Sequence, residues 1–449
     1  MGADMNKIIS ILVLICGVGL ISFSFTNCGK GKLKPTLKSE LDKQLDAIIS
    51  ANDLKPLPTP PPENPQLVTL GEELFNETGM SGLNDVSCAS CHEPTLGSGD
   101  NLPFALGSGA IGVFPNRRQF AGISVPMKRH SPAIFNKGHI TTGRTHALWD
   151  GRLTVDNGVI TSPVSDINGA NPARPDITAL MQNAFDLQPL FPIISADEFL
   201  GTNNPLANLG NPAVIWDTVL FNRLLVQSKY VNLFAEAFPS VSTGDLSPGH
   251  IARAIRAFVR TKFLANDTPF DRYIAGDIHA MTETQKLGMR VFYTNAACNV
   301  CHTGTMFTNE GFESIATPQL GFAPFQDDLG REQDTNNPED RYRFKVPNLR
   351  NAKLHPPFMH NGAFDTLEAV VDHYSNVSFS INNYVIPASY QQHYDDTLIV
   401  DTNAARNQER IDQITDPRLK NSLNLNPTDK AHLLEFLKEG LLDTKFINR

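Results

Sequence analysis

Two short motifs, each with two cysteines followed at once by a histidine, constrain this 449-residue chain more than any other feature of its sequence. They are Cys88-x-x-Cys91-His92 and Cys298-x-x-Cys301-His302, and they use four of the six cysteines. In a chain of this composition one such motif is expected by chance roughly 0.002 times, so two by accident are on the order of one in a million. The motifs therefore indicate a specific chemistry.

That chemistry is the covalent attachment of c-type haem. In each motif two thiols form thioether bonds to the porphyrin edge, and the adjacent imidazole then reaches the iron as its proximal ligand. Zinc sites and disulfides are the alternatives, but a zinc site built from paired cysteines does not require a histidine directly after each second cysteine. The sequence predicts two haem c groups, whose attaching and ligating residues are Cys88, Cys91 and His92 for the first and Cys298, Cys301 and His302 for the second. Two irons on one chain indicate redox work.

The first residues indicate export. An apolar run from Ile8 to Phe25 follows Lys7 and ends in small and polar residues, which is typical of a signal peptide. We take residues 1–28 as this signal and expect a periplasmic protein, which agrees with the usual attachment of haem c outside the cytoplasm. Cys28 follows the run and is a candidate for lipid modification, which would give a lipoprotein. Simple cleavage near this point and an uncleaved anchor remain open, because the run is at the short end of the ~20 residues that a membrane span needs.

A proline-rich stretch comes next. Six prolines fall between Lys55 and Gln66, so residues 29–67 are expected to form a stiff, extended linker, with the folded part beginning near Val68. The net charge of -9 and the pI near 5.7 disfavour a nucleic-acid partner, which would call for a basic surface.

The same arrangement precedes both motifs and suggests two similar domains. Thr69 and Thr282 each open a capping box, and apolar residues at helical spacing then lead to Cys88 and to Cys298. A last helix is expected from Asn426. Few stretches alternate with a period of two, so the predicted fold is mainly α, with a first haem domain at 68–276 and a second at 277–449. Long loops and a connecting helix would join the two cytochrome c-like domains.

The connecting helix begins at Ser247-Pro248 and has an apolar face that contains Ile251 and Ile255. Its other face contains three arginines, Arg253, Arg256 and Arg260. Charged residues at this spacing usually form a solvated face, and we expect that here, in preference to a binding patch.

Five segments around the two motifs resemble the bacterial dihaem cytochrome c peroxidase superfamily, which includes the MauG-like proteins. They are Trp149–Arg152, Thr268–Tyr273, Phe344–Asn351, Met359–Gly362 and Thr366–Val371. Each segment is weak alone, but their order around two haem motifs is highly specific. The resemblance implies that the N-terminal haem is the peroxide site and that the C-terminal haem collects electrons.

The resemblance also implies residues that assist peroxide cleavage. Family members supply a glutamine and a glutamate, which map here to Gln188 and Glu198. Such groups would move a proton between the two peroxide oxygens as their bond breaks. The alternative is that both are exposed loop residues. Trp149 resembles the family tryptophan between the haems, where its ring would relay an electron, although a packing role is the alternative.

Two positions place the chain nearer to the MauG-like members. Where many family peroxidases have a histidine that caps the peroxide-site iron, this sequence has Ser108, and a serine is a poor haem-iron ligand. The N-terminal iron is therefore expected to be open without reductive activation. Tyr374 corresponds to the distal ligand of the C-terminal haem and matches the residue type of MauG-like proteins. Met359 is the alternative ligand, and an ordinary core tyrosine is the other alternative for Tyr374.

Family members also bind calcium between the domains. The matching positions are His130, His355 and Pro357, of which the last two would supply backbone carbonyls. Imidazole is a poor ligand for a hard cation, so the sequence argues against calcium.

The leading hypothesis is an enzyme that reduces hydrogen peroxide with electrons from a small periplasmic cytochrome c or a cupredoxin. A MauG-like enzyme would instead oxidise a side chain of a partner protein. A dihaem electron carrier or redox sensor without turnover, and a dihaem oxygenase, are the remaining alternatives. Similarity within the family does not choose among them.

Overall fold

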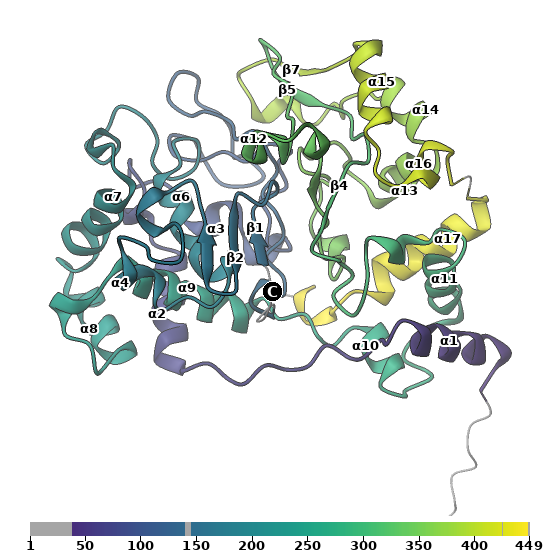
Figure 1. Ribbon diagram of the computed structural model, residues 1–449, viewed down its shortest axis with the longest axis horizontal. Helices are drawn as coiled ribbons and strands as arrows, with labels where there is room; N and C mark the ends of the chain where they lie inside the picture. The colour runs from purple at the N-terminus through teal and green to yellow at the C-terminus, as the bar shows by residue number, and fades with distance from the viewer. Residues whose placement is uncertain (1–37, 140–144, 424, 448–449) are drawn as a thin grey trace, which may run out of the picture. The chain divides into compact units, whose positions relative to one another are not determined.

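Helices dominate the regular structure of the computed structural model, which describes residues 38–139, 145–423 and 425–447 (Figure 1). The helices are α1 (Glu40–Ala51), α2 (Pro65–Phe75), α3 (Cys88–Cys91), α4 (Pro175–Thr178), α5 (Ala184–Leu187), α6 (Phe191–Ile194), α7 (Pro212–Thr218), α8 (Ser228–Ala237), α9 (Pro248–Lys262), α10 (Pro269–Ile274), α11 (Glu283–Tyr293), α12 (Glu332–Thr335), α13 (Leu367–Ser375), α14 (Val377–Asn382), α15 (Ala404–Asp412), α16 (Pro417–Lys420) and α17 (Pro427–Glu435). The prediction of a mainly α fold is confirmed.

The strands are short and all pair antiparallel. A three-stranded sheet has the order β1 (Thr145–Ala147), β2 (Leu153–Asp156) and β3 (Val159–Thr161). Two further pairs join β4 (Phe312–Glu313) to β6 (Phe344–Lys345) and β5 (Leu320–Phe322) to β7 (Leu398–Val400). In the first of these pairs Phe312 lies opposite Lys345. These strands brace long loops around the helical cores.

A close helix crossing organises the first hydrophobic core. Helix α2 packs against α9, and a Cβ atom at Gly71 would lie 2.0 Å from the Ala254 carbonyl oxygen. Only glycine therefore allows the two backbones to approach this closely. The core around the crossing contains Leu70, Phe258 and other apolar residues from the chain between α2 and the end of α9.

The second hydrophobic core also contains a close helix crossing at a glycine. Helix α11 packs against α17, and a Cβ atom at Gly288 would lie 2.0 Å from the His432 carbonyl oxygen. Phe292 and Phe436 pack together at a ring-centroid distance of 5.7 Å in this core. Each haem motif thus follows a helix that packs closely against another helix at a glycine. The two halves share this arrangement although they have little other sequence in common. The division at residues 276 and 277 itself remains a prediction.

Three of the four helix starts named from the sequence are confirmed. Thr282, Ser247 and Asn426 are the N-caps of α11, α9 and α17. The predicted start at Thr69 is wrong, because α2 begins one turn earlier, at Pro65 after the N-cap Asn64. Asn followed by Pro at the first helical position is the stronger start signal.

The folded structure also begins earlier than the sequence suggested. Helix α1 buries Leu45 in the second core, and the amide of Leu57 donates a 3.2 Å hydrogen bond to Asp271 Oδ1. The expectation that folding begins near Val68 is therefore wrong. The proline-rich stretch is extended, as expected, but it is anchored at several points along its length.

The expected signal peptide and Cys28 lie outside the described residues. Within the described ranges, no helix is both long and apolar enough to cross a membrane.

Candidate haem and peroxide site

Helix α3 presents the first motif. It contains Cys88 and Cys91, with Cys91 buried and Cys88 half-buried, and it ends at His92. His92 Nδ1 lies 3.1 Å from the Ser98 carbonyl oxygen and 3.2 Å from Ser131 Oγ. An Nδ1–H that donates to the carbonyl fixes the ring and leaves Nε2 with a free lone pair.

The second motif has the same arrangement. Cys298, Cys301 and His302 are half-buried in a single turn that follows α11. His302 Nδ1 lies 2.9 Å from the Phe307 carbonyl oxygen. Histidines that ligate metals almost always donate their other ring N–H in this way, so both imidazoles fit a proximal haem ligand.

The protonation states of these side chains also fit. Burial raises the pKa of the Cys88 thiol to about 12 and that of Cys301 to about 11, so these thiols stay protonated at neutral pH. Burial lowers the pKa of His92 to about 4, which keeps the imidazole in the neutral form that binds iron. All four cysteines of the two motifs are free of disulfides. The residues present fit two covalently attached haems.

A large cavity, of about 250 Å³, lies beside the second motif. Cys298, Cys301 and His302 line it, and most of its wall is apolar. An apolar wall with a few convergent polar groups is typical of a cofactor site.

Tyr374 lies on the wall of this cavity. Leu367, Val370, Val371 and Tyr374 of α13 all line it, so these four residues form the face of the helix that is directed to the cavity. Burial raises the pKa of the Tyr374 hydroxyl above the usual range for a phenol.

Met359 also lines the cavity, at a backbone φ of 74°. A positive φ is uncommon for a residue with a side chain and indicates a turn held in place by its surroundings. Both candidate distal ligands therefore lie on the same cavity wall, and the choice of Tyr374 over Met359 remains a prediction.

Trp149 lies on the cavity wall as well. Its indole Nε1 donates a 2.8 Å hydrogen bond to the His130 carbonyl oxygen, and its own carbonyl oxygen accepts from the Lys345 amide at 2.8 Å. The neighbouring Asp150 forms ion pairs with Arg129 and Arg152. Trp149 is thus held to the segment of His130 through its ring and to the segment of Lys345 through its backbone. This position is compatible with an electron relay and with a packing role.

Gln188 and Glu198 are half-buried, so the alternative of two exposed loop residues is excluded. Gln188 begins a single turn at Gln188–Leu190 and lines the large cavity, whereas Glu198 is not part of that lining. Glu198 instead lies on the side of the first motif: its carbonyl oxygen accepts from the Ser108 amide, and Cys91 Sγ lies 3.9 Å from the carbonyl oxygen of nearby Leu106. Burial, with the charge of Glu198 as a smaller cause, raises the pKa of the Cys88 and Cys91 thiols. The structure therefore does not bring the pair together: Gln188 lies on the cavity that the second motif lines, and Glu198 lies on the side of the first motif.

Glu198 has the acid–base properties that its predicted role requires. Burial, helped by the neighbouring Asp197, raises the pKa of Glu198 to about 7. A carboxyl group with a pKa near the working pH can both accept and donate a proton. Perturbed carboxyl groups of this kind are concentrated at functional sites.

Ser108 lies directly against this glutamate. Its amide donates a 2.6 Å hydrogen bond to the Glu198 carbonyl oxygen, and its hydroxyl donates to Asp85 Oδ1 at 2.8 Å. Asp85 also accepts from the Gly109 amide at 2.6 Å. Asp85 could not be predicted from the sequence, since no local pattern links it to a residue 23 positions away.

The position expected for calcium contains two facing imidazoles. His130 Nε2 and His355 Nε2 are 3.1 Å apart, and burial lowers the pKa of both rings. His130 Nδ1 lies 2.8 Å from the Leu102 carbonyl oxygen, so the imidazole already uses this oxygen as a hydrogen-bond acceptor. No cluster of three or more His, Cys, Asp or Glu side chains suited to a metal occurs in the described ranges. Neutral imidazoles between carbonyls do not fit a hard cation.

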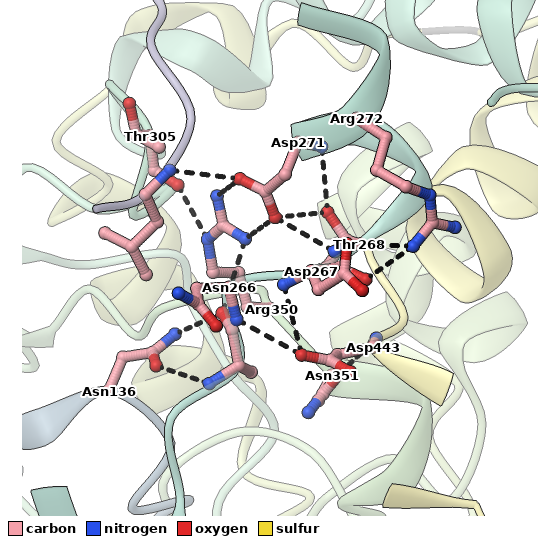
Figure 2. A network of polar contacts seen from close by, with 12 residues as sticks. Asn136, Asn266, Asp267, Thr268, Asp271, Arg272, Thr305, Arg350, Asn351 and Asp443 are labelled. Carbon is pink, nitrogen blue, oxygen red and sulfur yellow. Dashed lines mark hydrogen bonds and ion pairs between the residues drawn. The ribbon is translucent and has the colours of Figure 1, made fainter. Parts of the chain in front are cut away.

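Two of the family-like segments meet in a buried ion pair. Arg350 donates to both carboxylate oxygens of Asp271, at 2.5 and 2.7 Å (Figure 2). Its Nε donates to the Thr305 carbonyl oxygen at 2.8 Å, just after the second motif. This bidentate pair therefore holds the loop that carries Phe307, the hydrogen-bond partner of His302.

The arginines of α9 are not a solvated face, so that expectation is wrong. Arg256 is 6% exposed and pairs with Asp186, while Arg253 and Arg260 donate to Glu63 at 2.9 and 3.1 Å. Their partners come from distant parts of the chain, which a helical pattern alone does not reveal.

Comparisons with known proteins agree with this site. A model of the di-haem cytochrome c peroxidase family matches residues 65–279. The methylamine utilization protein MauG of Methylorubrum extorquens is 28% identical over 82% of this chain and 87% of its own length. A cytochrome c peroxidase of Escherichia coli is 26% identical over 71% of this chain and 55% of its own length.

Solved structures show the same fold. A MauG-like protein associated with microbial copper homeostasis superposes with a TM-score of 0.58 at 23% identity, over 88% of this chain and 94% of that protein. The diheme peroxidase BthA of Burkholderia thailandensis gives 0.56 at 18% identity, over 86% of this chain and 88% of its own.

Proposed function

The chain belongs to the di-haem cytochrome c peroxidase family, and from that premise we propose that it reduces hydrogen peroxide at the haem of the first motif. Electrons would reach that haem through the haem of the second motif from a small periplasmic cytochrome c or a cupredoxin. The haem irons would supply the redox chemistry. Residues 68–276 would form the peroxidatic domain and residues 277–449 the electron-transfer domain.

The observation that supports this proposal best is the position of Glu198. Its pKa is raised to about 7, its charge acts on the thiols of the first motif, and its backbone holds Ser108. A proton donor and acceptor in this position would serve the haem where peroxide would be cleaved. General acid–base assistance of this kind is typically worth about 10² to 10⁴-fold in rate.

Other residues would orient and connect the two sites. Gln188 would donate hydrogen bonds from the cavity wall, and Trp149, fixed by His130 and Lys345, would relay electrons. Ser108, whose hydroxyl is directed to Asp85, would leave the first iron open. Tyr374 would ligate the second iron.

MauG-like oxidation of a partner protein is the second candidate function. The position of Tyr374 on the cavity wall favours it, because an oxygen ligand stabilises oxidised iron more than a thioether does. On either proposal the chain acts after export, with residues 1–28 as its signal and Cys28 as a candidate lipid anchor.

Steady-state peroxide turnover with a reduced small c-type cytochrome tests the proposal. Mass spectrometry after solvent extraction is the control, since both haems must remain attached through thioether bonds. We expect sustained oxidation of the donor by peroxide in protein that retains two haems. Rapid electron exchange with the donor but no peroxide-dependent turnover would instead identify a carrier or sensor.

A further inference from the structure

A second cavity, of about 190 Å³, lies beside α9 and shares no lining residue with the large cavity. Glu63 and Gln182 line it, together with the three arginines of α9 at positions 253, 256 and 260. Nothing in the proposed peroxide chemistry uses this cavity.

The charges around this cavity do not balance. Glu63 accepts from Arg253 and from Arg260, and Asp186 pairs with the Nε of Arg256. Each of the three guanidinium groups has an ion-pair partner, but three of them share two carboxylates, which leaves an excess of one positive charge. The side chain of Glu63 is only 8% exposed and that of Asp186 only 1%. An uncompensated charge in such a place is costly.

Several donor atoms lack partners as well. Arg253 Nη1, Arg256 Nη2 and Arg260 Nε are buried and have no hydrogen-bond partner within the described part of the chain. Arg256 itself is 94% buried, since 6% of its surface is exposed. Native proteins rarely leave several buried donors unsatisfied around one space.

We propose that this cavity binds a small tetrahedral oxyanion of the phosphate or sulfate type. Such an ion has the negative charge that the cluster lacks, and guanidinium groups bind its oxygens through paired, charge-assisted hydrogen bonds. A volume of about 190 Å³ admits the ion together with ordered water. Pro61, Pro62 and Gln182 are exposed residues of its lining and leave an entry path from solvent.

The ion would join three separate segments. Glu63 precedes α2, the arginines lie on α9, and Asp186 lies in α5, directly before the turn that contains Gln188. An oxyanion held by all three arginines would fix these segments to one another. Binding should therefore stabilise the folded protein.

Isothermal titration of the haem-loaded protein with inorganic phosphate, sulfate and acetate, at constant ionic strength, tests this proposal. Gln182→Glu places a carboxylate at the entry and repels an anion without removing any ion pair. Arg253→Gln removes one of the three guanidinium groups that would bind the ion. Gln408→Glu, the same change at an exposed position of α15, is the matched control.

We expect one phosphate or sulfate ion per chain and a melting temperature that rises with its concentration. Affinity should fall at least tenfold in Gln182→Glu and Arg253→Gln and stay unchanged in Gln408→Glu. If Arg253→Gln does not fold, Gln182→Glu decides. The proposal is overturned by the absence of saturable binding, by equal affinity in Gln182→Glu and the control, or by a haem propionate that occupies the cavity in an experimental structure. Stronger binding of acetate than of phosphate would also overturn it.

Discussion

The amide of Ser108 donates a 2.6 Å hydrogen bond to the carbonyl oxygen of Glu198, so two segments that are 90 residues apart form one wall near the first haem motif. A Cβ atom at Gly107 would lie 2.1 Å from the same oxygen, so this contact leaves no room for a larger residue beside Ser108. The segment where many family members have an iron-capping histidine is therefore packed against the candidate acid–base residue.

Replacing Glu198 by Gln should slow peroxide cleavage by about 10² to 10⁴-fold, because the carboxyl group that transfers the proton is lost. Gln188→Ala should slow it too, through the loss of a hydrogen-bond donor. Stopped-flow measurement of the reaction with peroxide gives these rates, and haem content by mass spectrometry should stay at two. A wild-type rate in Glu198→Gln would show that another residue moves the proton.

The stability of the protein should depend on pH through Glu198. Its pKa is about 7 in the folded chain, above the ordinary value of 4.5, so between these pH values the folded chain keeps a proton that the unfolded chain releases. This residue therefore makes the folded state less stable as the pH rises from about 4.5 to 7. Between pH 5 and pH 8 the melting temperature of the wild type should fall relative to Glu198→Gln.

Glu72→Gln, at an exposed position on α2, is the control for this comparison and should follow the wild type. If the melting temperatures of the wild type and Glu198→Gln change with pH in the same way, the pKa of the Glu198 carboxyl group is the same in the folded and the unfolded chain, which contradicts this prediction.

The ion pair between Arg350 and Asp271 should be essential for stability. Asp271→Asn leaves a buried guanidinium without a charged partner, which typically costs about 3 to 5 kcal/mol. The neighbouring Arg272→Gln breaks an exposed pair with Asp267 and should cost about 0 to 1 kcal/mol. Urea denaturation of the haem-loaded variants measures both, and equal losses would contradict the structural role of Arg350.

Tyr374 should be the distal ligand of the second haem. Tyr374→Phe removes the oxygen and should change the low-spin haem spectrum and raise the reduction potential, since an oxygen ligand favours oxidised iron. Met359→Leu keeps an apolar side chain on the same cavity wall and should change neither. A spectral change in Met359→Leu alone would assign the methionine as the ligand and remove the main support for MauG-like chemistry.

Local sequence patterns predict the haem motifs and several helix starts of this protein. The haem motifs and the N-caps at Thr282 and Asn426 depend on residues within four positions of one another, so the sequence displays them directly. The partners of Ser108 and of the α9 arginines could not be predicted in this way. Asp85 and Glu63 come near these residues only in the tertiary fold. From the sequence alone, three arginines on one helical face predict a solvated face, because nothing local indicates that the segment at Glu63 packs against it.

The start of the folded part was misjudged for a related physical reason. Prolines between Lys55 and Gln66 do predict an extended backbone, but extension does not prevent docking. Leu57 and Glu63 anchor this stretch through Asp271 and the α9 arginines, which lie more than 180 residues away in the sequence. Proline content gives no information about such long-range partners.

The most direct test of the account is the reaction of the fully oxidised, two-haem protein with stoichiometric peroxide, without prior reduction. Because Ser108 is bonded to Asp85 and offers no ligand, the first haem should be high-spin at rest. We predict a high-spin signal in the resting electron paramagnetic resonance spectrum and a rapid absorbance change on adding one equivalent of peroxide. Ser108→Ala should behave in the same way, because the serine is not a ligand. A wholly low-spin resting spectrum that responds to peroxide only after one electron is added would contradict the account.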